Sequence, residues 1–174
     1  DTTGTVLETH PVAVDAEELR AILPRFMGTI SQLPPMYSAL KVNGQKLYDL
    51  ARQGKTVERK PREITIYELE LLARTAPDEF SLRVVCSKGT YIRTLCHDIG
   101  QVIGCGGCMA ALRRTMAAGF TISEAVTLEQ AQERGETLLL PLDEYFRAYP
   151  RFTVQNETQE KRAYNGNPFS ARNV

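Results

Sequence analysis

The sequence has few of the residues that build metal centres and disulfide-stabilised scaffolds. It contains two histidines, His10 and His97, and four cysteines among 174 residues. The two histidines lie far apart in the sequence, so a histidine-rich metal site is not available and we expect no metal. The cysteines are too few for the framework of a small secreted protein, and we expect reduced thiols at Cys86, Cys96, Cys105 and Cys108.

Long apolar runs and nucleotide-binding glycine motifs are also missing. No run reaches the length of a membrane span, and no charged-then-apolar leader with a cleavage site is present. The glycines at 104, 106 and 107 have neither Walker nor dinucleotide-binding spacing, and no serine or cysteine stands out as paired with a histidine base. We therefore expect a cytoplasmic protein that has no membrane anchor and no cofactor.

Net charge is balanced over the whole chain but not along it. Lysine and arginine together number 21, as do aspartate and glutamate. Residues 41–62 hold seven basic residues against two acidic ones, whereas residues 123–144 hold one basic residue against six acidic ones. The first segment has the charge to face phosphates, and the second should face water. Charge alone also allows a simpler interpretation, in which both segments are ordinary solvated faces.

Helix and strand signals alternate along the chain. Asp15 and Glu18 form a capping-box pattern that opens a helix, and its apolar face runs to Phe26. Residues 31–44 contain two adjacent prolines and no clean period, which predicts an extended loop, and residues 45–54 then predict a short helix ended by a glycine.

The second half of the pattern predicts a hairpin followed by further helices. Residues 64–71 alternate with one phase change, which indicates a strand with a bulge, and residues 80–86 alternate cleanly as its partner. A helix over 92–103 and a strand over 112–122 follow, and Thr127 with Gln130 opens a helix that runs to Arg134. We expect an α+β fold with a mixed, largely antiparallel sheet flanked by helices, and a domain boundary near Tyr149.

The stretch VVCSKGTYIRTLCHDIG, residues 84–100, places Lys88, Tyr91 and Arg93 around the beginning of the predicted helix. A helix dipole disfavours positive charge at this end. Tyr91 and Arg93 also lie off the apolar stripe, and strand-to-helix junctions often present functional side chains because rigid elements fix them on both sides. The alternative for Arg93 is a surface ion pair with an acid such as Asp98, which would contribute little stability.

The CGGC sequence at residues 105–108 has the spacing of a redox pair or of half a zinc site. A four-ligand site needs a second such pair, and Cys86 and Cys96 lie on a strand and a helix with unrelated spacing. We favour structural thiols, and an unrelated globular domain with a redox CGGC stays open as an alternative.

Three long stretches together resemble a known family. GTISQLPPMYSALKVNGQKLYDLARQG, CSKGTYIRTLCHDIGQVIGCG and ALRRTMAAGF occur in the order and at the distances found in the bacterial tRNA pseudouridine synthases that modify the T-loop uridine. The resemblance extends to about Tyr149. It implies the pseudouridine synthase fold, and isomerisation of a uridine to pseudouridine without metal or cofactor. It also implies the T-arm of tRNA as partner, and we expect a monomer.

The resemblance assigns roles to a small number of residues. Arg93 matches the arginine that pairs with the catalytic aspartate, Tyr91 matches an aromatic residue of the uracil pocket, and Leu112 matches an apolar residue near the base. Lys88 matches a motif lysine whose role is unassigned, and Leu112 has ordinary core packing as its alternative. A base extruded from a folded loop needs its flanking backbone held by phosphate contacts and stacking, for which the basic segment offers Tyr37, Lys41, Lys46, Tyr48 and Arg52.

The family motif that carries the catalytic aspartate, G-x-L-D-P, does not occur in these 174 residues. We therefore expect a fold that is incomplete at the N-terminus, with residues 1–149 forming the C-terminal part of the catalytic domain. We expect residues 150–174 to begin an incomplete RNA-binding module. The nucleophilic aspartate would then lie outside this chain, which alone would be inactive. The alternative is a non-catalytic RNA-binding or RNA-folding module.

Overall fold

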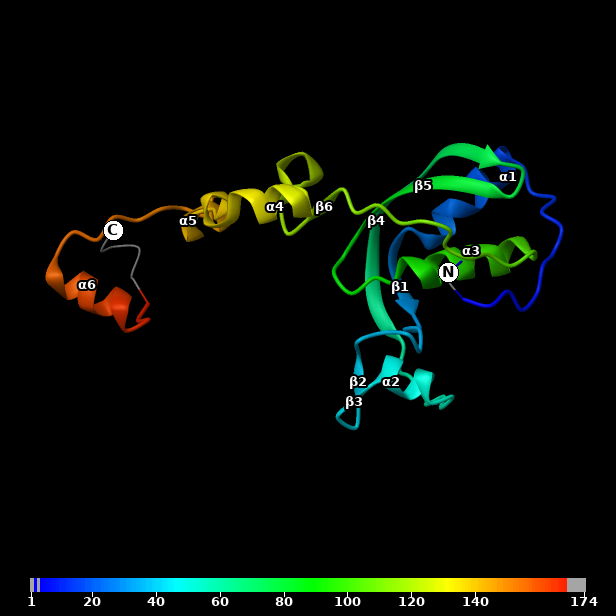
Figure 1. Ribbon diagram of the computed structural model, residues 1–174, viewed down its shortest axis with the longest axis horizontal. Helices are drawn as coiled ribbons and strands as arrows, with labels where there is room; N and C mark the ends of the chain where they lie inside the picture. Colours follow the sequence, from blue (N-terminus) through cyan, green and yellow to red (C-terminus); the bar gives the residue numbers. More distant parts are fainter. Residues whose placement is uncertain (1, 3, 169–174) are drawn as a thin grey trace. The chain divides into compact units, whose positions relative to one another are not determined.

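A computed structural model describes residue 2 and residues 4–168, and it forms two compact units, Asp1–Arg113 and Arg114–Val174 (Figure 1). This division reflects packing within the chain and leaves the boundary predicted near Tyr149 untested. None of the helices in the described part combines the length and the hydrophobicity that a membrane crossing requires.

A three-stranded antiparallel sheet organises the first unit. Its order is β1 (Gly28–Gln32), β4 (Arg62–Ala76) and β5 (Glu79–Cys86). The β4–β5 hairpin confirms the prediction for residues 64–71 and 80–86. The predicted bulge is also confirmed, because the pairing shifts register between Ile66 and Glu68, where the apolar pattern changes phase.

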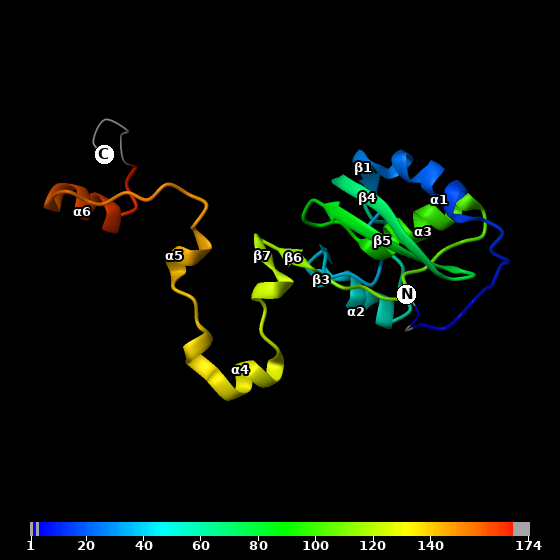
Figure 2. The same cartoon turned by 90° about the horizontal axis from the view of Figure 1, so that it is seen from above.

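Three helical segments share one hydrophobic core with this sheet (Figure 2). They are α1 (Ala16–Ile22), the 3-10 helix η1 (Leu23–Phe26) and α3 (Ile92–Ile103). Asp15 and Glu18 form the predicted capping box at the beginning of α1. The most deeply buried side chains of the core are Leu19, Leu23, Ile64, Ile66 and Leu95. Burying a side chain of this size stabilises the fold by about 1.5–3 kcal/mol.

The loop after α3 folds back tightly onto the helix. Gly104 ends α3 with a φ of 92°, and the amides of Gly104 and Gly106 both donate to the carbonyl of Gly100. A Cβ on Gly100 would lie 2.2 Å from backbone atoms of Gly106 and Gly107. One on Gly107 would lie 2.6 Å from the carbonyl oxygen of Cys96. Gly107 of CGGC therefore has a packing role, whereas Gly106 adopts a positive φ of 74°, and a Cβ on it would meet open space.

The basic segment contains a small hairpin where the sequence predicted an extended loop. β2 (Lys41–Val42) pairs with β3 (Gln45–Lys46), and Asn43 and Gly44 turn the chain with φ of 51° and 80°. The prediction of an extended loop over residues 31–44 was therefore wrong at its end. The Asn-Gly pair there is a strong sequence signal for a two-residue hairpin turn. The helix α2 (Leu47–Arg52) follows, close to the prediction of a helix over residues 45–54.

The second unit contains short elements. The predicted capping box of Thr127 and Gln130 opens its helix α4 and is confirmed. The predicted strand over 112–122 was wrong, because the chain turns at Ala118 and Gly119, both at positive φ, and makes a small hairpin instead. The elements are β6 (Met116–Ala117), β7 (Phe120–Thr121), η2 (Ile122–Glu124), α4 (Leu128–Arg134), η3 (Gly135–Leu138), α5 (Leu142–Tyr145) and α6 (Glu157–Tyr164).

Candidate functional site

The strand-to-helix junction between β5 and α3 is tied to the sheet by short polar contacts. The amide of Ser87 donates to the carbonyl of Thr65 over 2.8 Å, and the amide of Thr65 donates back to the Ser87 hydroxyl over 2.9 Å. The Thr90 hydroxyl closes the turn by donating to the Ser87 carbonyl over 2.9 Å. The turn therefore presents the beginning of α3 in a fixed place, as the sequence predicted for a functional junction.

Tyr91 is the N-cap residue of α3, and its backbone is held by the side chain of Gln32. The Tyr91 amide donates to Gln32 Oε1 over 2.8 Å, and Gln32 Nε2 donates to the Tyr91 carbonyl over 3.1 Å. Gln32 is almost wholly buried, with 2% of its surface exposed. The sequence predicted neither β1 nor a role for Gln32. The buried position at the end of this strand carries an amide side chain, whereas an apolar side chain is expected there.

Arg93 lies in the first turn of α3 and reaches the loop that follows β1. Its Nη2 donates to the carbonyl of Tyr37 over 3.0 Å. The structure therefore brings three predicted site residues into one place: Tyr91, Arg93 and the backbone of Tyr37. Tyr37 as a whole is 56% exposed.

The loop over residues 33–40 is held at further points. Arg59 Nη1 donates to the Pro34 carbonyl over 3.0 Å, and the amide of Tyr48 donates to the Ser38 carbonyl over 3.1 Å. Ser38 is buried, and its hydroxyl makes no hydrogen bond to the described residues. These contacts connect the loop to α2 and to the segment that follows α2.

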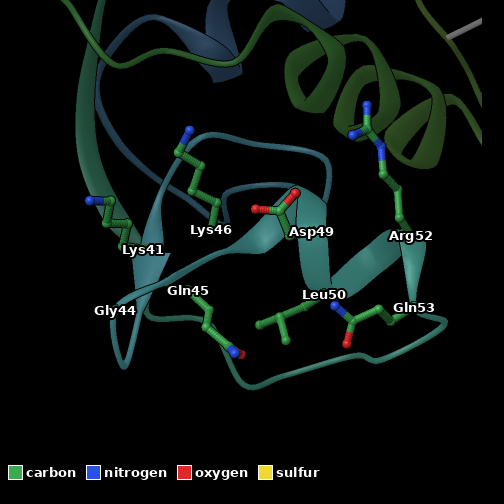
Figure 3. A pocket seen from close by; sticks show the side chains of 8 residues that line it. All are labelled: Lys41, Gly44, Gln45, Lys46, Asp49, Leu50, Arg52 and Gln53. Carbon is green, nitrogen blue, oxygen red and sulfur yellow. The ribbon is translucent and has the colours of Figure 1, made fainter.

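Lys41, Lys46 and Arg52 lie around one open hollow of about 630 Å³ (Figure 3). Lys41 and Lys46 are directly opposite each other in the β2–β3 register, so both side chains lie on one face of the hairpin. Like charges in that position are destabilising unless an anion lies between them. Asp49 supplies one carboxylate on the same rim; the remaining lining residues are Gly44, Gln45, Leu50 and Gln53.

Tyr48 links two of these cations. Lys46 Nζ donates to the Tyr48 hydroxyl over 2.9 Å and lies 5.3 Å from the ring centroid, and the guanidinium carbon of Arg52 lies 5.2 Å from the same centroid. The hydrogen bond to Tyr48 raises the pKa of Lys46. The hairpin and α2 thus present fixed positive charge beside an aromatic ring, which suits contact with a nucleic acid backbone.

Two further predicted site residues are Lys88 and Leu112. Lys88 is exposed in the turn before α3. Leu112 is 54% exposed and belongs to no helix or strand, so in this structure it is not part of the hydrophobic core. Their predicted contacts with substrate stay predictions.

On α3, the thiol of Cys96 and the carboxyl group of Asp98 both have raised pKa values. All four cysteines are free thiols, and burial raises the pKa of Cys96, with the nearby Cys108 adding to the effect. A raised pKa lowers the thiolate fraction, which disfavours a reactive thiol at this position. Burial also raises the pKa of Asp98. Over the described residues, no three or more histidine, cysteine, aspartate or glutamate side chains gather as a metal site.

Comparison with known families gives two adjoining matches. Residues 1–92 match the family described as TruB family pseudouridylate synthase (N terminal domain). Residues 93–147 match the tRNA pseudouridylate synthase B C-terminal domain.

Curated relatives and solved structures agree with these matches. A tRNA pseudouridine synthase B of Ralstonia pickettii is 47% identical over 171 residues, covering 94% of this chain and 53% of the relative. One of Pseudomonas syringae is 56% identical over 133 residues, covering 76% of this chain and 43% of the relative. The chain spans about half the length of the curated relatives it matches. A chain of a crystal structure of a Cbf5-Nop10-Gar1 complex is 29% identical, with a TM-score of 0.57 over 80% of this chain and 37% of its own.

Proposed function

The chain belongs to the TruB family of pseudouridylate synthases, and on that basis we propose that the protein isomerises a uridine in the T loop of tRNA to pseudouridine. The observation that carries the proposal is the family match over residues 1–92, which continues through residues 93–147 and includes the whole Gln32–Tyr91–Arg93 junction. The basic hollow beside that junction fits an RNA substrate.

The proposed reaction rearranges one nucleoside without adding or removing atoms. The glycosidic bond between ribose C1′ and uracil N1 breaks, the base rotates, and a new bond joins C1′ to C5. The proton on C5 is lost and N1 gains one. The chemistry requires a group that acts on the nucleoside and a pocket that retains the detached base, and it needs no metal or cofactor.

In this proposal Arg93 holds the carboxylate of the catalytic aspartate. A guanidinium offers two parallel N–H groups to a carboxylate, which keeps the acid ionised and oriented better than a lysine does. We propose that the aspartate comes from the part of the relatives' length that this chain does not span. Tyr91 lines the uracil pocket, Leu112 supplies an apolar contact to the base, and Lys88 lies in the turn beside them.

The basic hairpin and α2 hold the RNA while the base is extruded. Lys41, Lys46 and Arg52 contact phosphates, and the ring of the exposed Tyr37 stacks on a neighbouring base. Extrusion costs unstacking energy, which such contacts offset. We further propose that residues 1–149 belong to the catalytic domain, that residues 150–174 begin an RNA-binding module, and that the protein acts as a cytoplasmic monomer on the T-arm.

The test is pseudouridine formation by the full-length protein on a synthetic T-arm RNA, measured by nucleoside mass spectrometry and mapped by chemical labelling. We expect one pseudouridine at the T-loop uridine and none when that uridine is replaced by cytidine. Tight RNA binding without any pseudouridine would contradict the proposal and favour a non-catalytic RNA-binding module.

A further inference from the structure

We propose that Gln32 is a positioning residue for the reaction: its side-chain amide fixes the backbone of Tyr91 and thereby sets the direction of the pocket tyrosine and of Arg93. This inference rests on the proposed function. It concerns a residue to which the sequence patterns gave no role, and which contacts neither the basic hollow nor the substrate in the proposed arrangement.

The geometry of the contact is specific to a carboxamide. Gln32 Oε1 accepts from the Tyr91 amide over 2.8 Å while Gln32 Nε2 donates to the Tyr91 carbonyl over 3.1 Å, so one planar group satisfies both backbone groups of a residue 59 positions away. The contact imitates a strand pairing at the end of β1. At 2% exposure the amide is shielded from water, and an unsatisfied partner there would be costly.

The contact acts at a helix end that no side chain of the described residues caps. Tyr91 is the N-cap residue of this helix, α3. The Tyr91 carbonyl accepts the first helical bond from the Leu95 amide over 3.1 Å, while the Tyr91 amide has Gln32 as its partner. Restraining the amide and the carbonyl of one residue fixes its Cα–Cβ direction, and therefore the place from which the tyrosine ring projects.

The same strand end also positions Arg93. The loop over residues 33–40 leaves β1 directly after Gln32, and its Tyr37 carbonyl accepts the hydrogen bond from Arg93. Two contacts therefore join the end of β1 and the loop after it to one helix end: Gln32 to Tyr91, and Tyr37 to Arg93. Loss of the first contact would let the loop and the first turn of α3 shift together, and small misplacements of catalytic groups reduce rates steeply.

Two variants of Gln32 and one control separate positioning from mere structural support. Gln32→Leu removes both hydrogen bonds at similar volume. Gln32→Glu has nearly the same shape; its ionised form accepts from the Tyr91 amide but repels the Tyr91 carbonyl, whereas its protonated form can donate to that carbonyl and restore both bonds. Ile30→Val, two residues earlier on the same face of β1, loosens packing against the core without touching Tyr91.

The experiment measures kcat, KM and melting temperature of the full-length protein on T-arm RNA, together with hydrogen exchange at the Tyr91 amide. We expect Gln32→Leu to lower kcat by about 10- to 100-fold with KM changed less than about twofold, and the Tyr91 amide to exchange faster. Ile30→Val should keep kcat. Burial raises the pKa of a carboxyl group, so the activity of Gln32→Glu relative to the unmodified protein should rise as pH falls, whereas that of Gln32→Leu stays level.

Either of two results would overturn the positioning role alone. One is an unchanged kcat in Gln32→Leu. The other is a loss of kcat that Ile30→Val reproduces at an equal melting temperature. Unmodified protein that forms no pseudouridine would overturn the proposed function, and the positioning role of Gln32 with it.

Discussion

Arg93 lies at a helix end where the helix dipole disfavours its positive charge, and this unfavourable position suggests a negatively charged partner. A positive charge in the first turn of a helix opposes the dipole by about 0.3–1 kcal/mol. In the structure its Nη2 donates to the Tyr37 carbonyl, which is a neutral acceptor. A carboxylate beside the Arg93 guanidinium would offset the unfavourable helix dipole more fully. The proposal places the catalytic aspartate there.

Replacing Arg93 by lysine in the full-length protein should lower kcat on T-arm RNA by about 100-fold or more, because a lysine cannot hold a carboxylate by two parallel bonds. RNA affinity and melting temperature should stay close to those of the unmodified protein. Steady-state kinetics, filter binding and thermal unfolding measure the three quantities.

The matched control is Arg83→Lys on β5, where an exposed arginine lies 3.4 Å from Glu68. Exposed ion pairs contribute little, so this change should leave all three quantities unchanged. Normal turnover in Arg93→Lys, or a loss that unfolding explains in full, would make Arg93 a structural residue.

At the scale of elements, α3 and the glycine loop behind it form one packed unit. The loop lies so close to the helix that neither Gly100 nor Gly107 has room for a Cβ. The loop thus packs on the C-terminal half of α3, and Leu95 and Ile99 of the same helix lie in the hydrophobic core. Within CGGC, close packing accounts for Gly107 and a positive φ of 74° for Gly106.

Gly100→Ala should destabilise the protein by about 1–3 kcal/mol or more, because the added methyl would overlap backbone that cannot move aside cheaply. Denaturant unfolding measures the change. Gln101→Ala, the next residue and exposed on the same helix, should stay within about 0.5 kcal/mol. Equal stability of both variants would show that the loop is not packed against α3 as described.

The proposed function makes the basic hairpin and α2 a second functional element. Changing Lys41, Lys46 and Arg52 to glutamine should weaken T-arm binding and flatten its salt dependence, by up to about 0.9 in log–log slope for each phosphate that the protein no longer neutralises. Fluorescence titrations at several salt concentrations measure the slope. The same three-charge change at Arg20, Arg25 and Arg74, exposed in the same unit, is the control, and a slope altered equally by both sets would place the RNA elsewhere.

The sequence predicted correctly those elements whose local signals agreed with the tertiary packing. The capped α1, the bulged β4–β5 hairpin and α3 had clear periodicity and caps, and they are confirmed. β1 was missed because its inward end is Gln32, which is buried by hydrogen bonding to a residue 59 positions away. No local pattern indicates such a contact. The sequence pair Asn43 and Gly44 does indicate a hairpin turn, but the nearby prolines favoured the prediction of a loop.

At the scale of the whole molecule, the predicted α+β architecture with the pseudouridine synthase fold is confirmed by the structure and the family match. The chain holds the arginine, the pocket tyrosine and a basic face within one compact unit, residues 1–113. The aspartate motif is not among its residues. The proposed function therefore assigns a division of labour: these residues position and bind, and the acid that acts on the nucleoside comes from outside them.

Pseudouridine formation by the isolated 174-residue chain, beside the full-length protein on the same T-arm RNA, tests this claim most directly. We predict that the full-length protein converts the T-loop uridine, whereas the isolated chain converts none even when a shift in RNA mobility shows that it is bound. Pseudouridine produced by the isolated chain would contradict the claim, because an acid within these residues would then perform the chemistry assigned to the aspartate outside them.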